Sequence, residues 1–510
     1  MSVQSGDGLG TIETNIGITQ SSSHPRRYPN SPTSSLLRLP TELILKIFEH
    51  AIESESGLLL ILTSICRELR EIGVTAPYLW STVCLAIPLL GELFLERCNY
   101  DPHTLIVSRS TRERQHPHKN WDPRRETVWL RLEGCAFKNL RSLVFEGTPP
   151  EFERRAVPIL QRASNISSLE FINTSIQGMR LPWNPSAPIP HLSTLHLRGV
   201  STAWNSPLLR NLKHLEMDLG LFDPPPESPP IETFLAALTN CPDLESLELA
   251  RARPEALDGH EGSRNTVVQL RKLQKFYLEY NDPLTVRYLL SHIEYPESAR
   301  VKLAVAVGWD ADISETIYKV LPSGDSDPLR YFRKNKILTI YLGDDTHTFS
   351  ADHSTILCRN QFLHHPQALS QFTAKFLQVI GRDTLVLSVA RWGIDLTKGT
   401  WEAIFRGLPR LERLSYQRYR NERSQDLVDP FILAFSHSSG GAPVFPQLQD
   451  LELPRELFTQ KASAALLKQA LAERIACGRR LRRLGLSDGW AEEADGLLSE
   501  QFRHLVDEIQ

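Results

Sequence analysis

The sequence lacks a strong excess of charge of either sign. Its 510 residues carry 57 basic and 60 acidic side chains, a formal net charge of −3, and no strongly basic block stands out. A nucleic acid held by bulk electrostatics would require a clear basic excess, because its phosphates are contacted mainly by Lys and Arg. The composition therefore argues against a nucleic acid partner.

Cysteine is scarce, and an apolar leader is missing. The seven cysteines form no Cys-x-x-Cys pair, and their odd number suits reduced thiols in an intracellular protein. Residues 1–35 are rich in Gly, Ser, Thr and Pro without an apolar run, so we expect a disordered tail and neither a signal peptide nor a membrane anchor. These absences predict a protein of the cytoplasm, the nucleus or both, with no membrane partner.

Sequence motifs of catalysis are also missing. The glycines between Gly6 and Gly10 are spaced like a phosphate loop, but no strand precedes them and no helix follows. Neither HExxH nor GxSxG occurs, and His116 and His118 lack a cysteine or carboxylate at ligand spacing. We therefore expect no catalytic residue, no cofactor and no metal, and we do not expect an enzyme.

What the sequence does contain is a recurring spacing, Leu-x-x-Leu-x-Leu with conservative substitutions, found ten times between Asn139 and Leu486. The ten segments are LRSLVF from Leu140, ISSLEF from Ile166, LSTLHL from Leu192, LKHLEM from Leu212, LESLEL from Leu244, LQKFYL from Leu273, ILTIYL from Ile337, LERLSY from Leu411, LQDLEL from Leu448 and LRRLGL from Leu481. Positions four and six lie two residues apart, so both face one side of a short strand, and position five faces the other side. One such strand buries little alone, and stacked neighbours supply a continuous core.

The intervals between these segments leave room for helices and for further repeats. The interval from the first residue of one segment to that of the next is mostly near or somewhat above the roughly 20 to 29 residues of leucine-rich repeats. Two long intervals have room for degenerate repeats, with strand leucine equivalents at Val301 and Leu303 and at Leu385 and Leu387. An ordinary α/β core is the alternative, but it would not return to one template ten times.

Apolar stripes predict return helices between the strands. One runs from Ile231 to Leu238 at helical spacing, and another from Leu467 to Ile475 stops at Gly478. The expected fold class is α/β: a curved parallel sheet with outer helices, resembling leucine-rich repeats of the irregular, long kind. We assign residues 83–138 to a connecting segment and the start of the array, 139–490 to the repeats, and 491–510 to a capping helix with Phe502 and Leu505 on its apolar face.

Residues 36–82, ahead of the repeats, predict a small helical bundle. Pro40 suits a first helical turn, and Glu42 places negative charge at the positive end of the helix. Apolar residues from Leu43 to Ile52 form a broad stripe. A second helix is expected from about Leu58 to Ile72, followed by a turn at 77–80. The core of so short a segment is too small to make it stable by itself, so we expect the bundle to pack against a partner.

This stretch resembles an F-box. The resemblance rests on Leu39-Pro40, Glu42, Ile47-Phe48, Ile65-Cys66-Arg67 and Pro77-x-Leu79-Trp80. It is similar in particular to the F-box-like segment of fungal proteins that continue into irregular leucine-rich repeats. Leu69 departs from that pattern, because the family commonly has Trp there, although an apolar side chain is kept.

The resemblance implies the substrate-recognition subunit of a Skp-cullin-F-box ubiquitin ligase. In such a complex the F-box docks on the Skp adaptor, and through it on a cullin, while the repeats bind the target protein. The residues expected at the adaptor surface are Leu39, Pro40, Leu43, Ile44, Ile47, Phe48 and Trp80. Two alternatives remain: a helical cap of the first repeat, and a leucine-rich-repeat scaffold or inhibitor not linked to ubiquitination.

Substrate is expected on the concave face, which carries the position-five residues. Carboxylates prevail there, with two tyrosines among them, so we expect an acidic surface that attracts a basic or neutral segment and repels a phosphorylated one. The residues expected to bind substrate are Glu170, His196, Glu216, Glu248, Tyr277 and Tyr341. The alternative is that these carboxylates only solvate an exposed strand face. The sequence does not identify the substrate.

Overall fold

The computed structural model divides the chain into two compact units, Met1–Leu79 and Trp80–Gln510. The structure describes residues 35–54, 57–108, 123–175, 178–181, 183, 185, 189–220, 230–251, 267–281, 283–307, 337–342, 346–351, 354–360, 377, 383–392, 396–419, 429–436, 445–459, 461–486 and 502–509. The N-terminal tail lies outside these residues.

The first unit is a bundle of three short helices. They are α1 (Thr41–Ser54), α2 (Leu58–Ile65) and α3 (Arg67–Val74), between the 3₁₀ turns η1 (Ser35–Arg38) and η2 (Pro77–Trp80). The single helix expected from Leu58 to Ile72 is therefore wrong. Cys66 has an extended backbone (φ −150°, ψ 170°), and its Sγ accepts a hydrogen bond from the Leu69 amide. This cap ends one helix and begins the next.

The core of the bundle is small and closely packed. Phe48 and Leu69 are each 1% exposed, so leucine at the departing position keeps the packing of the bundle. Gly73 of α3 lies directly on this core, because a Cβ atom there would be 2.6 Å from Thr63 Cγ2 and 3.1 Å from Phe48 Cε2. The bundle therefore requires glycine at this contact.

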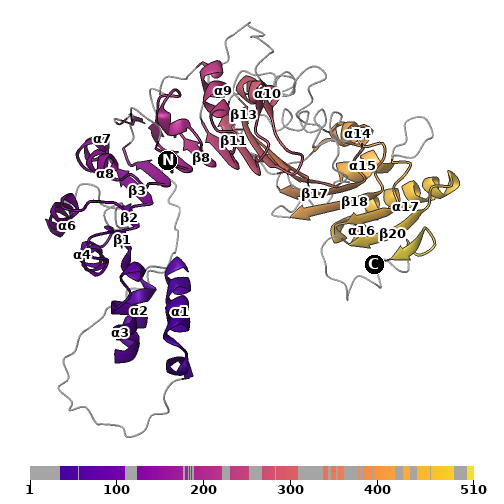
Figure 1. Ribbon diagram of the computed structural model, residues 1–510. Coiled ribbons are helices and arrows are strands. Elements are labelled where there is room, and N and C mark those ends of the chain that lie inside the picture. The colour runs from indigo at the N-terminus through magenta and orange to yellow at the C-terminus, as the bar shows by residue number, and fades with distance from the viewer. Residues whose placement is uncertain are drawn as a thin grey trace, which may run out of the picture. The chain divides into compact units, whose positions relative to one another are not determined.

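The second unit is built on one long sheet, which contains 17 strands among the described residues (Figure 1). In spatial order they are β1 (Thr82–Cys84), β2 (Thr104–Val107), β3 (Ser142–Gly147), β4 (Ser168–Asn173), β6 (Thr194–Arg198), β8 (His214–Asp218), β9 (Ser246–Ala250), β11 (Lys275–Asn281), β13 (Arg300–Val307), β16 (Ser354–Asn360), β15 (Thr346–Ala351), β14 (Ile337–Leu342), β17 (Val386–Trp392), β18 (Arg413–Tyr419), β19 (Asp450–Leu453), β20 (Leu481–Leu486) and β21 (Val506–Ile509). All ten template segments contain a strand, and both expected degenerate repeats supply one, β13 and β17. In β17 the buried pair is Leu387 and Val389, whereas the predicted Leu385 lies ahead of the strand. The sheet begins before the template does, at β1.

The sheet is parallel except at β15. This strand runs antiparallel to β14 on one side and to β16 on the other, while β16 pairs in parallel with β13 and β14 with β17. Only three residues separate β14 from β15, and two separate β15 from β16. A meander of short hairpins is thus inserted between two runs of the array, which the spacing of leucines did not predict.

Helices follow many of the strands and lie along one face of the sheet (Figure 1). They include α4 (Pro88–Arg97), α6 (Pro123–Glu133), α7 (Pro149–Glu151), α8 (Val157–Arg162), α9 (Ile231–Thr239), α10 (Pro283–His292), α14 (Lys398–Arg406), α15 (Pro430–Ser436), α16 (Arg455–Thr459) and α17 (Lys461–Ala476), with a π-helical turn η3 (Phe152–Ala156) before α8. The stripe predicted at 231–238 is buried in α9. The stripe that ends near Gly478 lies in α17, and Gly478 has the left-handed φ of +69° expected after a helix end.

Two arginines bond the loops between repeats. Arg162, at the end of α8, donates to the carbonyl oxygens of Glu133 and Cys135, and Arg474 of α17 donates to those of Phe445 and Leu448 at 3.1 and 3.0 Å. Glu133 ends α6 and Cys135 lies in the loop between α6 and β3, while Phe445 and Leu448 lie in the loop before β19. Regular repeats use an asparagine in the turn for such bonds, and this chain uses a longer side chain from the next helix.

The C-terminal end differs from the expected capping helix. Residues 506–509 form β21, which pairs in parallel with β20, while residues 487–501 lie outside the described residues. Phe502 is buried and packs against Phe458 with ring centroids 5.5 Å apart. Of the apolar residues that we assigned to a helical stripe, Phe502 is helical and Leu505 lies in the turn before β21, and the strand that follows satisfies the free edge of β20.

Candidate interaction surfaces

Five of the six residues predicted to bind substrate form one row across the sheet. Register pairs Glu170 with His196, His196 with Glu216, Glu216 with Glu248, and Glu248 with Tyr277. Neighbouring strands are about 4.8 Å apart, so these residues lie side by side. All five are half-buried, whereas the flanking apolar residues of each strand are buried. We call the side that carries this row the open face; its role in binding remains a prediction.

Tyr341 is not part of this row, and its assignment to position five is wrong. Leu338 of β14 pairs with Leu387, so the residue of β14 that continues the row is Thr339, and Tyr341 lies two residues beyond it. Leu338, Ile340 and Leu342 are apolar residues at alternate positions of β14. Positions four and six of the template can therefore be aligned with the first two of them or with the last two. Only the pairing with β17 distinguishes them.

The row extends further than the sequence suggested. Lys302 of β13 follows Tyr277, and its place between Val301 and Leu303 of the degenerate repeat was a signal that pointed to it. Beyond Lys302 the row passes through the meander with a run of hydroxyl residues: Thr355, Ser350, Thr339, Ser388 and Ser415. The open face therefore changes from charged to neutral beyond Lys302, and the next residue of the row after Ser415 is Glu452 of β19.

Its charged part is less acidic than predicted, because cations lie between the carboxylates. Three ion pairs join neighbouring strands or strand ends: Arg198 with Glu216 (3.4 Å), Arg251 with Asp218 (2.8 Å), and Lys302 with Glu279. None of the three cations belongs to the set of residues predicted to bind substrate. The expectation of an acidic surface is therefore corrected: in this part of the open face, cations nearly balance the carboxylates of the described residues.

Glu170 and Glu248 are the carboxylates of the row that stand apart from these pairs. Within the described residues, neither has a cationic partner. Glu248 accepts a hydrogen bond of 3.1 Å from the Ser246 hydroxyl. These two side chains keep acceptor capacity that Glu216 and Glu279 have already used.

The predicted adaptor residues separate into an exposed and a buried set. Leu39, Leu43 and Ile47 are 37%, 45% and 40% exposed, and Pro40 is exposed as well. The other three are buried within the chain: Ile44, Phe48 and Trp80. Their burial corrects the predicted contact set, because a side chain that forms the core of its own unit presents no surface to a partner.

Trp80 belongs to the core of the repeat unit. Its ring packs edge-on against Phe94 of α4 at 5.0 Å, and Arg97 lies over it. Three further large hydrophobic side chains of the helical unit are exposed, and none of them was predicted at the adaptor surface: Ile61, Ile65 and Tyr78. The pKa of Tyr78 is raised by partial burial and by Glu49. Ile61 and Ile65 are one helical turn apart, a spacing that could have indicated a second apolar stripe.

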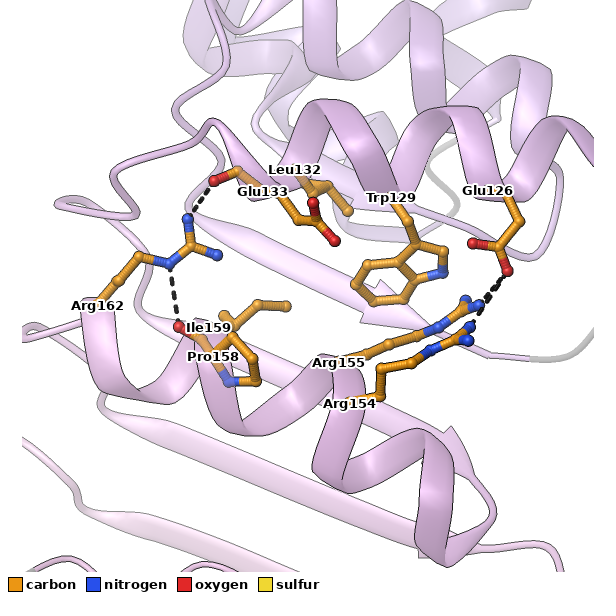
Figure 2. A pocket seen from close by; sticks show the side chains of 9 residues that line it. All are labelled: Glu126, Trp129, Leu132, Glu133, Arg154, Arg155, Pro158, Ile159 and Arg162. Atoms are coloured by element: carbon orange, nitrogen blue, oxygen red, sulfur yellow. Dashed lines mark hydrogen bonds and ion pairs between the residues drawn. The ribbon is translucent and has the colours of Figure 1, made fainter.

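A groove of about 390 Å³ lies on the helical side of the repeat unit, between α6 and the η3–α8 segment. Figure 2 shows Arg154 and Arg155 directed at Glu126, with Trp129 above Arg155 and with Ile159 and Pro158 further along. Nothing in the leucine pattern indicated this groove. Its only sequence sign is the pair of adjacent arginines.

Two other kinds of site are absent from the described residues. No helix in this part of the chain is long and apolar enough to cross a bilayer. Nor does any group of three His, Cys, Asp or Glu side chains there have the arrangement of a metal site. The histidines at 116, 118, 364 and 365 lie outside the described residues.

Comparison with known proteins yields one kind of likeness. No family model matches the sequence, and no curated protein matches it. Among solved structures, a chain in the crystal structure of the TLR13–ssRNA13 complex matches with 14% sequence identity and a TM-score of 0.31. The match covers 71% of this chain and 43% of that chain. The strands and helices described above, and not this match, are the basis of the resemblance to a leucine-rich-repeat solenoid.

Proposed function

We propose that this protein is the substrate-recognition subunit of a Skp-cullin-F-box ubiquitin ligase. The helical unit would dock on the Skp-type adaptor and through it on a cullin, and the open face of the repeats would hold the protein to be ubiquitinated. Catalysis would belong to other subunits, so the chain itself would need no cofactor or metal. The cytoplasm, the nucleus or both would be its place of action.

The observation that carries this proposal is the apolar exposure of the helical unit. Leu43 and Ile47 lie one turn apart on α1, and Ile61 and Ile65 are 59% and 61% exposed on α2. Isolated exposed apolar side chains are ordinary, but a group of them on a bundle this small is typical of a surface that a partner covers. The F-box-like motif supplies the identity of that partner.

The adaptor contact is tested by changing exposed residues only. Leu43→Glu with Ile47→Glu should abolish recovery of purified Skp-type adaptor, because two charges would have to enter an apolar contact. Lys46→Ala, on the same helix and exposed, is the matched control and should bind normally. Circular dichroism of the double variant should match the parent. Unchanged adaptor affinity in the double variant would refute the assignment.

Substrate capture is proposed for the open face, centred on Glu170 and Glu248. We propose a basic or neutral segment that is not recognised through phosphate, because the two unpaired carboxylates would repel a phosphate group. Glu170→Lys with Glu248→Lys should reduce ubiquitination of the substrate and leave adaptor binding intact. Glu473→Lys, exposed on α17, is the control. Capture that requires a phosphorylated substrate and improves on charge reversal would contradict this recognition mode.

A protein-interaction scaffold without a link to ubiquitination is the second candidate. The repeat architecture supports it as well as it supports the first, because it concerns only the binding face. The two functions differ at the helical unit. Purification of the intact chain from cells should recover adaptor and cullin if the first is right, and should recover other partners without them if the second is right.

A further inference from the structure

The groove between α6 and α8 holds an unusual convergence of two cations. Neighbouring residues of an α-helix project about 100° apart, because a turn takes 3.6 residues. Arg154 and Arg155 are neighbours, yet an Nη2 atom of each reaches the same oxygen, Oε1 of Glu126 (Figure 2). They lie in the π-helical turn η3. Such turns are rare, and many of those known lie at functional sites.

Positive charge exceeds negative charge in this groove. Its lining has three arginines against two glutamates, and Arg162 is held by backbone carbonyl oxygens rather than by a carboxylate. Burial lowers the pKa of Arg155, Glu126 opposes that effect, and the nearby charge of Arg154 lowers the pKa further. The same oxygen of Glu126 thus contacts two guanidinium groups, and Glu151 is a second acidic neighbour of Arg155. The Nη1 atom of Arg155 is nevertheless buried with no hydrogen-bond acceptor among the described residues, so it can donate to a second anion.

The surroundings of Arg155 fix its position. Its side chain is 6% exposed, and its guanidinium carbon lies 4.8 Å from the centre of the Trp129 ring. Stacking of this kind pre-organises a guanidinium for a planar anion. Trp129 is itself buried, and its Nε1–H has no acceptor among the described residues. A polar ligand that enters beside Arg155 can supply one.

We propose that this groove binds an acidic peptide segment of a partner protein. A carboxylate of the peptide would bridge Arg154 and Arg155, and an aliphatic side chain close to it would pack against Pro158 and Ile159 further along (Figure 2). A volume of about 390 Å³ is too large for a carboxylate alone and is in the range of sites for ligands of a few residues. This site lies on the helical side of the sheet, and it does not depend on the function proposed above.

The test uses the full chain and a set of labelled hexapeptides. Each peptide carries one Glu or Asp and one Leu at varied separation, and each has a matched Gln or Asn version. Fluorescence anisotropy should show at least one carboxylate peptide that binds about tenfold more tightly than its amide version. If no peptide binds, or if the amide versions bind equally well, the proposal fails.

Exposed variants separate recognition from folding. Arg154→Gln should weaken the best peptide about tenfold, whereas Glu126→Gln should strengthen it several-fold because it removes the internal competitor of the ligand. Arg131→Gln, on the same helix but paired with Glu92 and Glu96, should have no effect. Weaker binding in the Glu126 variant would overturn the proposal. So would displacement of the peptide by inorganic phosphate at an equal concentration, which would indicate a site for free oxyanions.

Discussion

Two kinds of side chain hold the repeats together. Apolar residues at positions four and six form the core, and arginines such as Arg474 bond the loops from inside. Burial lowers the pKa of Arg474 to about 10, so it remains charged at neutral pH, and its Nη1 and Nη2 atoms donate to two backbone carbonyl oxygens. Apolar contacts therefore stabilise the core of the repeats, and hydrogen bonds from buried arginines stabilise the loops.

Truncation of one inward leucine should be costly. Leu247 of β9 is fully buried, so Leu247→Ala should lower the free energy of unfolding by about 2 to 5 kcal/mol through lost burial and the cavity left behind. Its neighbour Glu248 is half-exposed, and Glu248→Ala should change stability by less than about 0.5 kcal/mol. Urea unfolding of both variants checks the difference. Similar losses in the two would contradict the assigned facing of β9.

Cysteine reactivity offers a second check at this scale. Burial is the main cause that raises the pKa of the Cys135 thiol to about 11, and it also raises the pKa of Cys241. At pH 8 only about one in a thousand Cys135 side chains would then be thiolate, the form that reacts with iodoacetamide. Cys477 is exposed and should be alkylated first.

Mass spectrometry of the alkylated chain should show this order in the folded protein and lose it in urea. The rate at Cys135 should rise with pH up to about 11, because the thiolate fraction rises with it. Equal rates at Cys135 and Cys477 before unfolding would contradict the burial of Cys135.

Individual elements show what the sequence could and could not predict. The strands from β3 to β13 and from β17 to β20 follow from the template, because positions four and six determine which face is buried. The meander does not, since the β14 strand has the same apolar alternation as a repeat strand and differs only in the partner it pairs with. Pairing partners are set by turns and by distant residues, which the period of one strand does not record.

The same reasoning explains the two parts of the candidate surfaces. The row from Glu170 to Tyr277 was predictable because alternation places it. The burial of Ile44 and Phe48 was not, since a broad apolar stripe does not show which of its residues face the bundle. The break at Cys66 was also missed, because its effect depends on backbone angles that α2 and α3 impose together.

Removal of β21 should expose the edge of β20. Arg480 donates to the carbonyl oxygens of His504 and Val506 and forms an ion pair with Asp507 at 3.1 Å. A chain that ends at residue 501 should be less soluble, and trypsin should cut it sooner at the arginines of residues 479–483, because the backbone of β20 loses its partner.

Limited proteolysis followed by mass spectrometry measures the effect. Asp507→Asn is the control, because it removes the ion pair and keeps the strand, and exposed ion pairs contribute little. Equal protease resistance of the shortened chain would show that β21 does not protect this end of the sheet.

At the scale of the whole molecule, the division at Leu79 and Trp80 predicts that the repeat unit folds without the helical unit. A chain of residues 80–510 should be soluble and keep the thermal transition of the repeats, since Trp80 and its contacts with Phe94 are retained. It should not bind a Skp-type adaptor. Calorimetry and an adaptor pull-down check the two statements, and an insoluble fragment would contradict the division.

The meander has a geometric consequence for this array. In a solenoid of strands and helices, the bulkier helices on one side force neighbouring strands to fan apart, which bends the sheet. The two connections that join β14, β15 and β16 are too short to contain a helix. These two connections therefore add two strand spacings, roughly 10 Å of sheet, and supply no helix of their own as a wedge. The hydroxyl-bearing part of the open face should thus be flatter than the charged part, and it should suit a straight partner segment where the charged part suits a rounded one.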